Sequence, residues 1–394
     1  MSSLIKLKDS SPAMEHLVGI GLLLAFLLPH TSTLFLMVNP LLCITLVLLS
    51  SGRRNIYYFW IVLIPLTVSL VFNIAGNIAF KSMLSWLTIV MYFTLFPFVG
   101  PVRLRNSYLT VCLAFIILSQ LVYLLDIGFL TSFIDTYYPI SESDVNFYTQ
   151  MQRNISYDNI INYRLGGLYR NPNQCSRYLT FLLAFYLVNN RCQPFRRQWV
   201  FATFAFGAIL LTGSRTGLAV AVLILFFSFF RRRDLNGFAK VLIVVAVLFG
   251  GVFLVSSGLS DIRAFDFQRG LSGSFDRKWW TFYNYYLSEE SVFSMLFGHL
   301  DPEQFHSTVA RAMEQFDTDY GNLIYCFGII GFLSFFVYWA MIGSRLMRSS
   351  RVFFLLLFWM LGTTLVMSYR TCFIFQFLLS IIYSNDLKNR YKER

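Results

Sequence analysis

Long apolar segments alternate with short polar connections along most of the chain. The segments reach about the length that crosses a bilayer as a helix, and they lack the periodicity of amphipathic helices in soluble proteins. Only residues 368–370 separate the last two segments, so one long broken helix is the alternative there. The pattern predicts about twelve membrane-spanning helices, over residues 14–29, 33–50, 56–74, 82–99, 107–126, 175–189, 198–212, 216–230, 238–257, 319–343, 352–367 and 371–384.

The composition supports the bilayer as the solvent for most of the chain. Of its 394 residues, 56% are hydrophobic and only 13% are charged. An average soluble domain has about 25% charged residues. The sequence therefore predicts an all-α polytopic membrane protein that forms a single integral membrane domain over residues 1–394.

The basic residues, which give a net charge of +12, lie in short clusters between the apolar segments. They form no continuous basic face, so we expect no nucleic-acid partner. If the N-terminus is cytoplasmic, alternate connections carry most of these clusters, as cytoplasmic loops do. We therefore expect both termini on the cytoplasmic side.

Two long segments, residues 127–174 and 258–318, then fall on the far side of the membrane. They hold most of the Asp and Glu residues and are rich in Tyr, Ser, Asn and Gly. Neither has the apolar content to fold alone, so we expect short helices on the membrane surface. An active site, if the chain has one, is expected in these segments and the adjoining helix ends.

The first of the two long far-side segments, residues 127–174, ends in Arg-Leu-Gly-Gly-Leu-Tyr-Arg-Asn-Pro-Asn-Gln, residues 164–174. Glycines allow close backbone approach, while Arg164 and Arg170 each offer a planar fork for phosphate. Asn-Pro marks a turn where a helix begins. The alternative interpretation is an interfacial loop whose arginines bind lipid headgroups.

A second candidate is the turn Leu-Thr-Gly-Ser-Arg-Thr-Gly, residues 211–217, between two apolar segments on the far side. Arg215 there departs from the positive-inside tendency. Gly-Ser beside the start of a helix can help to hold an anion. The alternative is that Arg215 merely extends its charge to the membrane surface.

The second long segment interleaves basic and aromatic residues, among them Arg263, Arg277 and Trp280. Arginine pairs with phosphate and aromatic faces pack on sugar rings, so this mixture suits a pyrophosphate-linked sugar. Aromatic residues also favour membrane interfaces, which is the alternative for Trp280.

Two carboxylates, Asp317 and Asp319, lie beside Tyr320 where the chain is expected to re-enter the membrane. They are either ion-pair partners of arginines, or one of them takes a proton from an attacking hydroxyl. His306 is a second candidate base. The chain has no Walker motif, Rossmann fingerprint, zincin helix or nucleophile elbow, and its histidines lie far apart. We therefore expect no metal ion, nucleotide or other cofactor.

At these four places the chain resembles the O-antigen polymerase and O-antigen ligase family of bacterial membrane glycosyltransferases. Residues 164–173 look like its Arg-Gly-hydrophobic-aromatic-x-Asn-Pro-Asn element, and residues 211–217 look like its Ser-Arg-Thr-Gly turn. Arg277 with Trp280, followed by residues 296–299, is similar to its Arg-x-x-Trp and hydrophobic-Phe-Gly pattern.

One departure from the family pattern favours a polymerase over a ligase. Ligases of the family carry His-Asn, with Gly-x-x-Gly eleven residues after the His; here Asp317 stands eleven residues before Gly328-Ile-Ile-Gly331. Polymerases vary widely in sequence and often have Asp at this position. The departure also removes any base role borrowed from the ligase histidine.

The resemblance implies a GT-C-like fold in a bacterial inner membrane, with the two long loops and the active site in the periplasm. Its implied reaction joins undecaprenyl-diphosphate-linked repeat units into O-antigen or another polysaccharide. Membrane lipids and a chain-length regulator are the other expected partners. On this hypothesis the diphosphate ligands are Arg164, Arg170, Arg215 and Arg277, further substrate contacts come from Asn173, Arg263, Trp280 and Tyr320, and the acceptor hydroxyl is handled by Asp317, Asp319 or His306.

Two alternatives remain open. The ligase that transfers finished polymer to lipid A core is the nearer one. A flippase for lipid-linked oligosaccharide, or another secondary transporter, also fits twelve helices. Transporters usually show half-to-half symmetry and ionisable residues near the bilayer midplane, whereas here the halves differ and the charges lie in far-side loops.

Overall fold

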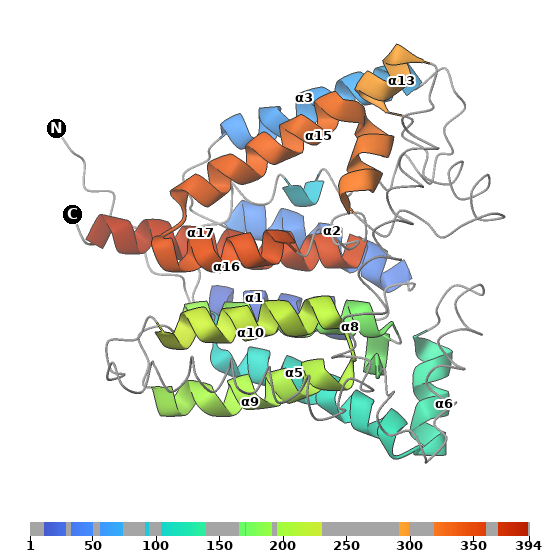
Figure 1. Cartoon of the computed structure of the whole chain (residues 1–394), viewed down its shortest axis with the longest axis vertical. Helices are drawn as coiled ribbons and strands as arrows, with labels where there is room; N and C mark the ends of the chain where they lie inside the picture. Colours follow the sequence, from blue (N-terminus) through green and yellow to red (C-terminus); the bar gives the residue numbers. More distant parts are fainter. Residues whose placement is uncertain are drawn as a thin grey trace, which may run out of the picture. The chain divides into compact units, whose positions relative to one another are not determined.

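The computed structural model describes a helical chain (Figure 1), and no strand occurs among the described residues. These are residues 12–28, 33–49, 56–73, 91–93, 104–138, 165–169, 171–190, 195–230, 291–298, 319–359 and 369–392. The elements are α1 (Pro12–Leu27), α2 (Thr33–Leu49), α3 (Ile56–Asn73), α5 (Asn106–Leu124), α6 (Gly128–Tyr137), η3 (Gly167–Tyr169), α8 (Pro172–Asn189), α9 (Phe195–Leu211), α10 (Arg215–Phe230), α13 (Val292–Phe297), α15 (Asp319–Arg345), α16 (Arg348–Trp359) and α17 (Tyr369–Lys392).

Apart from the short helices α6, η3 and α13, the helices lie where the apolar segments predicted them, and the all-α class is confirmed for the described residues. Two helical stretches, Asn106–Leu124 and Leu323–Arg345, are long and apolar enough to cross a membrane. The shorter apolar helices are Pro12–Leu27, Gln198–Leu211, Arg215–Ser228 and Cys372–Asp386. The predicted span 238–257 and most of 82–99 lie outside the described residues, so the number twelve stays a prediction.

The chain divides into two compact units. The first comprises Met1–Ala25, Leu36–Arg105 and Ser274–Arg394, and the second comprises Phe26–Phe35 and Asn106–Gly273. The two long predicted loops are divided between them: residues 127–174 belong to the second unit, and most of 258–318 belongs to the first.

The second unit is built from α5, α8, α9 and α10, which lie side by side in Figure 1. The Tyr186 ring of α8 stacks on Phe201 of α9, with 3.8 Å between the ring centroids. The Asn106 side chain at the start of α5 donates to that of Asn190 at the end of α8, at 2.7 Å. Because this bond joins opposite ends of the two helices, α5 and α8 are antiparallel.

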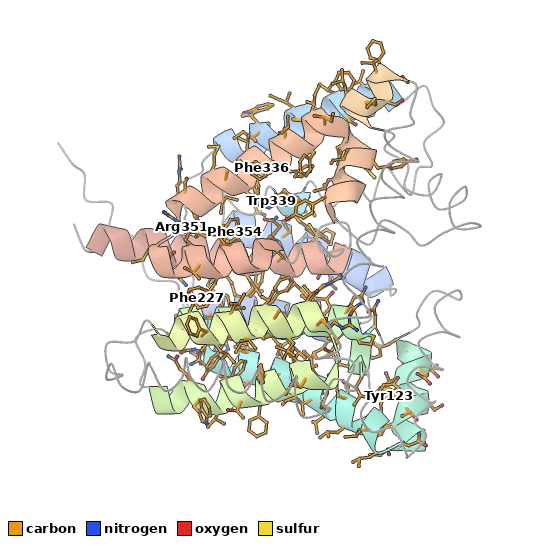
Figure 2. The ribbon with its side chains drawn as sticks, in the orientation of Figure 1. Tyr123, Phe227, Phe336, Trp339, Arg351 and Phe354 are labelled. Atoms are coloured by element: carbon orange, nitrogen blue, oxygen red, sulfur yellow. The ribbon has the colours of Figure 1, made fainter. Side chains whose placement is uncertain are left out.

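The short helix α6 runs across the end of α5 (Figure 1). Its Ile134 is buried in a cluster with Tyr123, Leu165 and Leu168. The Tyr123 hydroxyl, labelled in Figure 2, donates to Asp135 Oδ1 at 2.9 Å. The opposite side of α6 exposes large apolar side chains, with Phe129 80% exposed. A short helix in the first long loop was predicted, and its membrane-surface location stays a prediction.

In the first unit, α3 lies along α15, and α13 packs against both (Figure 1). The structure differs here from the single continuous span predicted over residues 319–343, because Gly328 breaks the α15 helix with φ 65° and ψ −175°. Gly298, which ends α13, also has a positive φ of 77°. A Cβ on Gly328 would overlap the Leu296 backbone, and one on Gly298 would overlap the Cys326 backbone. The two backbones therefore meet where only glycine fits.

The second half of α15 has one buried and one exposed side. Trp339 is buried, whereas Phe336 is half exposed (Figure 2). The buried Tyr338 hydroxyl donates to the Phe93 carbonyl at 2.9 Å and to Gln376 Oε1 of α17 at 3.4 Å. These bonds fix the inner side of α15 against its neighbours in the first unit.

The last helix continues past the apolar segment that predicted it, from residue 384 to Lys392. The extension includes Asp386, whose Oδ2 accepts from the Met347 amide at 2.9 Å just before α16 begins. Arg351, labelled in Figure 2, donates to the carbonyls of Gly343 and Ser344 at the end of α15. Hydropathy misses this extension because its residues are polar, and one of them, Asp386, satisfies an amide at a helix start.

Candidate functional site

Four of the predicted site residues fall among the described residues, all at the beginnings of helices. They are Asn173 on α8, Arg215 on α10, and Asp319 and Tyr320 on α15; for Asp319 only the backbone is described. The remaining predicted site residues lie outside the described residues: Arg164, Arg170, Arg263, Arg277, Trp280, His306 and Asp317.

The glycine-rich segment and the Ser-Arg turn contact each other in the second unit. The Leu165 amide donates to the Leu211 carbonyl at 2.9 Å. The Gln120 side chain of α5 donates to the carbonyls of Leu165 and Ala208, both at 3.1 Å. We call this contact between residues 165–169 and 208–217 the loop–turn junction.

The end of α9 is fully bonded at the loop–turn junction. The last carbonyls of a helix have no partner within it and need donors from elsewhere. In α9, each of the last four carbonyls accepts a hydrogen bond from a donor. The carbonyls of Ala208, Ile209, Leu210 and Leu211 accept, in that order, from the Gln120 side chain and the amides of Thr212, Gly213 and Leu165.

Close packing also holds η3 in place. Gly167 has a φ of 54°, and a Cβ there would overlap the Ser119 Oγ of α5. The same Oγ accepts from the Leu168 amide at 3.0 Å. The Tyr169 hydroxyl donates to the Phe26 carbonyl at 3.0 Å. A left-handed backbone beside a neighbouring side chain requires glycine, so Gly167 is explained by its close approach to α5.

The Asn-Pro-Asn sequence begins α8, as predicted. Asn171 is the N-cap, and its side-chain oxygen accepts from the amides of Asn173 and Gln174 at 2.9 and 3.3 Å. Pro172 occupies the first helical position, where a missing N–H costs nothing. The half-buried Asn173 side chain lies in the first turn of α8; its predicted contact with substrate stays a prediction.

The Ser-Arg turn begins α10 beside α8. Arg215 is the first residue of α10 and is half-buried. The Ser214 Oγ accepts from the Gly217 amide at 3.4 Å. A Cβ on Gly217 would overlap the Ser176 Oγ of α8. Both helices thus start at one end of the second unit and run in parallel, which places two positive dipole ends and a guanidinium at the same end.

The predicted acidic site begins α15 in the first unit. Asp319 is the first residue of α15. The half-buried Tyr320 lies edge-on to Phe332, with 6.3 Å between ring centroids. This ring pair bridges the break at Gly328, so Tyr320 supports the bent shape of α15. A role for Tyr320 in substrate binding stays a prediction.

No protein-family model matches the chain, and no curated protein sequence matches it. The family resemblance therefore stays a prediction. Within each unit, however, segments that carry the resemblance contact each other. Residues 165–169 meet the Ser-Arg turn in the second unit, and Phe297-Gly298 meets the Gly328 break in the first.

Sequence reasoning missed three buried polar residues of the second unit. Ser119 and Gln120 fix the loop–turn junction from α5, and Arg177 is buried on α8. All three lie inside predicted spans. Burying a polar or charged side chain in an apolar span costs free energy unless the side chain makes hydrogen bonds or ion pairs. The presence of these polar residues inside apolar spans was the sequence signal that could have identified them.

Replacing Gln120 by Met is expected to loosen the loop–turn junction. The change keeps the side-chain length but removes both donors, which leaves two buried carbonyls unsatisfied. Each costs about 1–3 kcal/mol, so the unfolding temperature of the detergent-solubilised protein should fall clearly. Thr110→Val, at an exposed position of the same helix, is the control and should change little. An unchanged unfolding temperature for Gln120→Met would contradict this role.

Proposed function

We propose that this chain is a multi-pass glycosyltransferase of the bacterial inner membrane that polymerises lipid-linked polysaccharide repeat units on the periplasmic face. Its main support is the loop–turn junction. There two separate segments come together beside Arg215 and the starts of α8 and α10. Such a place suits a phosphate-ester anion, because helix N-termini and a guanidinium all favour negative charge. Arg164 and Arg170 flank the same segment in sequence.

The donor in this proposal is the growing polymer attached to undecaprenyl diphosphate. A hydroxyl of an incoming lipid-linked unit attacks the anomeric carbon, forming a new glycosidic C–O bond. The bond between that carbon and the diphosphate oxygen breaks, and its electron pair leaves with undecaprenyl diphosphate. Arg215 and Arg277, with Arg164 or Arg170, stabilise the charge that grows on the diphosphate in the transition state.

The proton of the attacking hydroxyl needs an acceptor. Asp317 or Asp319 is proposed for this role, with His306 as the alternative. Asp319 begins α15, directly before Tyr320. Arg263, Trp280 and Asn173 are proposed to contact the rest of the substrate.

Reconstitution tests the function directly. The purified full chain in lipid nanodiscs is supplied with an undecaprenyl-diphosphate-linked repeat unit, and the products are separated by gel electrophoresis. A polymerase gives a ladder of products and releases undecaprenyl diphosphate. Transfer that occurs only when lipid A core is added identifies the ligase. Absence of any glycosidic product with either acceptor refutes the glycosyltransferase proposal.

A carrier for lipid-linked oligosaccharide is the second candidate, and the break in α15 favours it. Discontinuous helices form the substrate sites of many transporters, and Gly328 interrupts an otherwise apolar helix. The two candidates differ in one measurement. A carrier in proteoliposomes moves a fluorescent lipid-linked sugar across the bilayer without forming a glycosidic bond. The polymerase forms the bond with no need for transbilayer movement.

A further inference from the structure

Arg177 is a buried charge close to the loop–turn junction. It lies in the second turn of α8 and is only 3% exposed. Burying a guanidinium costs free energy, so charged residues inside apolar spans mark functional positions in membrane proteins. Long helical side chains incline toward the helix N-terminus, which directs the Arg177 charge toward the end of α8 that starts at the junction.

The neighbouring Ser176 presents a second polar group there. Its side chain is 1% exposed, and within the described part of the chain its Oγ has no hydrogen-bond partner. A Cβ on Gly217 would overlap this Oγ and would come within 3.4 Å of the Ser214 Oγ. The Ser176 hydroxyl therefore faces the first turn of α10. An unused buried hydroxyl is expensive to keep, and a ligand that accepts its hydrogen bond removes that expense.

The surrounding helices carry only positive charge. The sequences of α5, α8, α9 and α10 contain no Asp or Glu. The helix starts of α8 and α10 add partial positive charge next to Ser176. Arg215 begins α10 two residues before Gly217, whereas Arg177 follows Ser176 on α8. The two arginines thus lie on neighbouring helices, each within two residues in sequence of the Ser176–Gly217 contact.

We propose that Ser176 and Arg177 form an inner phosphate subsite beside Arg215, so that this end of the second unit binds a diphosphate ester in preference to a monophosphate ester. The inference rests on the proposed function and deepens it. Arg215 pairs with one phosphate, and Arg177 with the Ser176 hydroxyl pairs with the other. A monophosphate ester fills only one of the two positions.

Binding of prenyl phosphates measures this preference. The full chain in phosphatidylcholine nanodiscs is titrated with geranylgeranyl diphosphate and with geranylgeranyl monophosphate. The unmodified protein should bind the diphosphate more tightly. Arg177→Gln should weaken diphosphate binding by about 10- to 100-fold, the usual effect of one hydrogen bond to a charged group. It should leave monophosphate binding nearly unchanged, so that the preference is lost.

Two further variants keep the test decisive if Arg177→Gln does not fold. Arg177→Lys keeps the charge without the planar fork and should lose part of the preference. Ser176→Ala is nearly isosteric and should weaken diphosphate binding by several fold. Arg105→Gln is the control, since Arg105 pairs with Glu15 at 3.2 Å in the first unit and should leave binding unchanged. Unaltered diphosphate preference in both Arg177→Lys and Ser176→Ala overturns the inference.

Lipid headgroups are the other source of phosphate. Phosphatidylglycerol added in excess should compete poorly, because it carries one phosphate. In a competition experiment with labelled geranylgeranyl diphosphate, phosphatidylglycerol should displace less label than unlabelled geranylgeranyl diphosphate does. If the two displace it equally, the subsite is a headgroup site and the inference is overturned. The polymerisation assay separates the two proposals. If the protein forms polymer but its diphosphate binding does not depend on Arg177, only the subsite proposal is refuted. If diphosphate binding depends on Arg177 but no polymer forms, only the polymerase proposal is refuted.

Discussion

Replacing Arg215 by Ala should slow polymerisation by about 100-fold at equal protein level. Arg215 begins α10 at the loop–turn junction, where it is proposed to stabilise the departing diphosphate. One such donor commonly contributes ~3 kcal/mol to lowering the barrier, which corresponds to roughly two orders of magnitude in rate. The measurement is the initial rate of undecaprenyl diphosphate release from a defined lipid-linked repeat unit. Arg215→Lys should be intermediate, because lysine keeps the charge and loses the planar fork.

A matched arginine shows whether the effect is local. Arg105 is partly exposed and pairs with Glu15, and exposed ion pairs contribute about 0–1 kcal/mol. Arg105→Ala should therefore polymerise at the normal rate. If Arg215→Ala makes full-length polysaccharide at the normal rate and protein level, Arg215 does not stabilise the departing diphosphate, and this part of the proposed mechanism is wrong.

Replacing Gly328 by Ala should destabilise the first unit strongly. The backbone of Gly328 has φ 65° and ψ −175°, a region that side-chain-bearing residues essentially avoid. The added methyl group would also overlap the Leu296 backbone, which cannot rotate away as a side chain does. Strain and overpacking together should cost about 2–5 kcal/mol. Thermal unfolding of the purified protein and the yield of monodisperse protein measure the loss.

Gly207→Ala is the matched control for this substitution. Gly207 lies within α9, and a Cβ there would have no atom within 4 Å. Alanine is favoured over glycine in a helix by about 1 kcal/mol, so this variant should be as stable as the unmodified protein or slightly more so. If Gly328→Ala unfolds at the same temperature as Gly207→Ala, the break in α15 is not a fixed feature of the fold.

Hydropathy was enough to locate the helices, because the free energy of burying apolar side chains adds up along each segment. The predicted segment at residues 107–126 became α5 over 106–124, and the one at 198–212 became α9 over 195–211. The Asn-Pro start of α8 was also predictable, since capping depends on residues next to each other in sequence. Local interactions explain these successes.

Features that depend on contacts between distant segments were not predictable from one sequence. The break at Gly328 depends on where α13 ends against α15. The extension of α17 depends on Asp386 reaching the start of α16. In sequence, Gly328 and Asp386 look like any other glycine or aspartate. Their structural roles become clear only from the residues that they contact in the folded chain.

Hydropathy and local motifs were enough to predict a helical, strongly apolar chain and to select the glycine-rich segment and the Ser-Arg turn as candidate site segments. The packing of the helices was needed to show that these two segments meet, that Gln120 joins them, and that Ser176 lies beside them with Arg177 next to it in sequence. The difference lies in how far along the chain each interaction acts. Hydropathy and helix capping act between neighbours in sequence, whereas a binding site is made by hydrogen bonds and charges that become neighbours only after the helices pack.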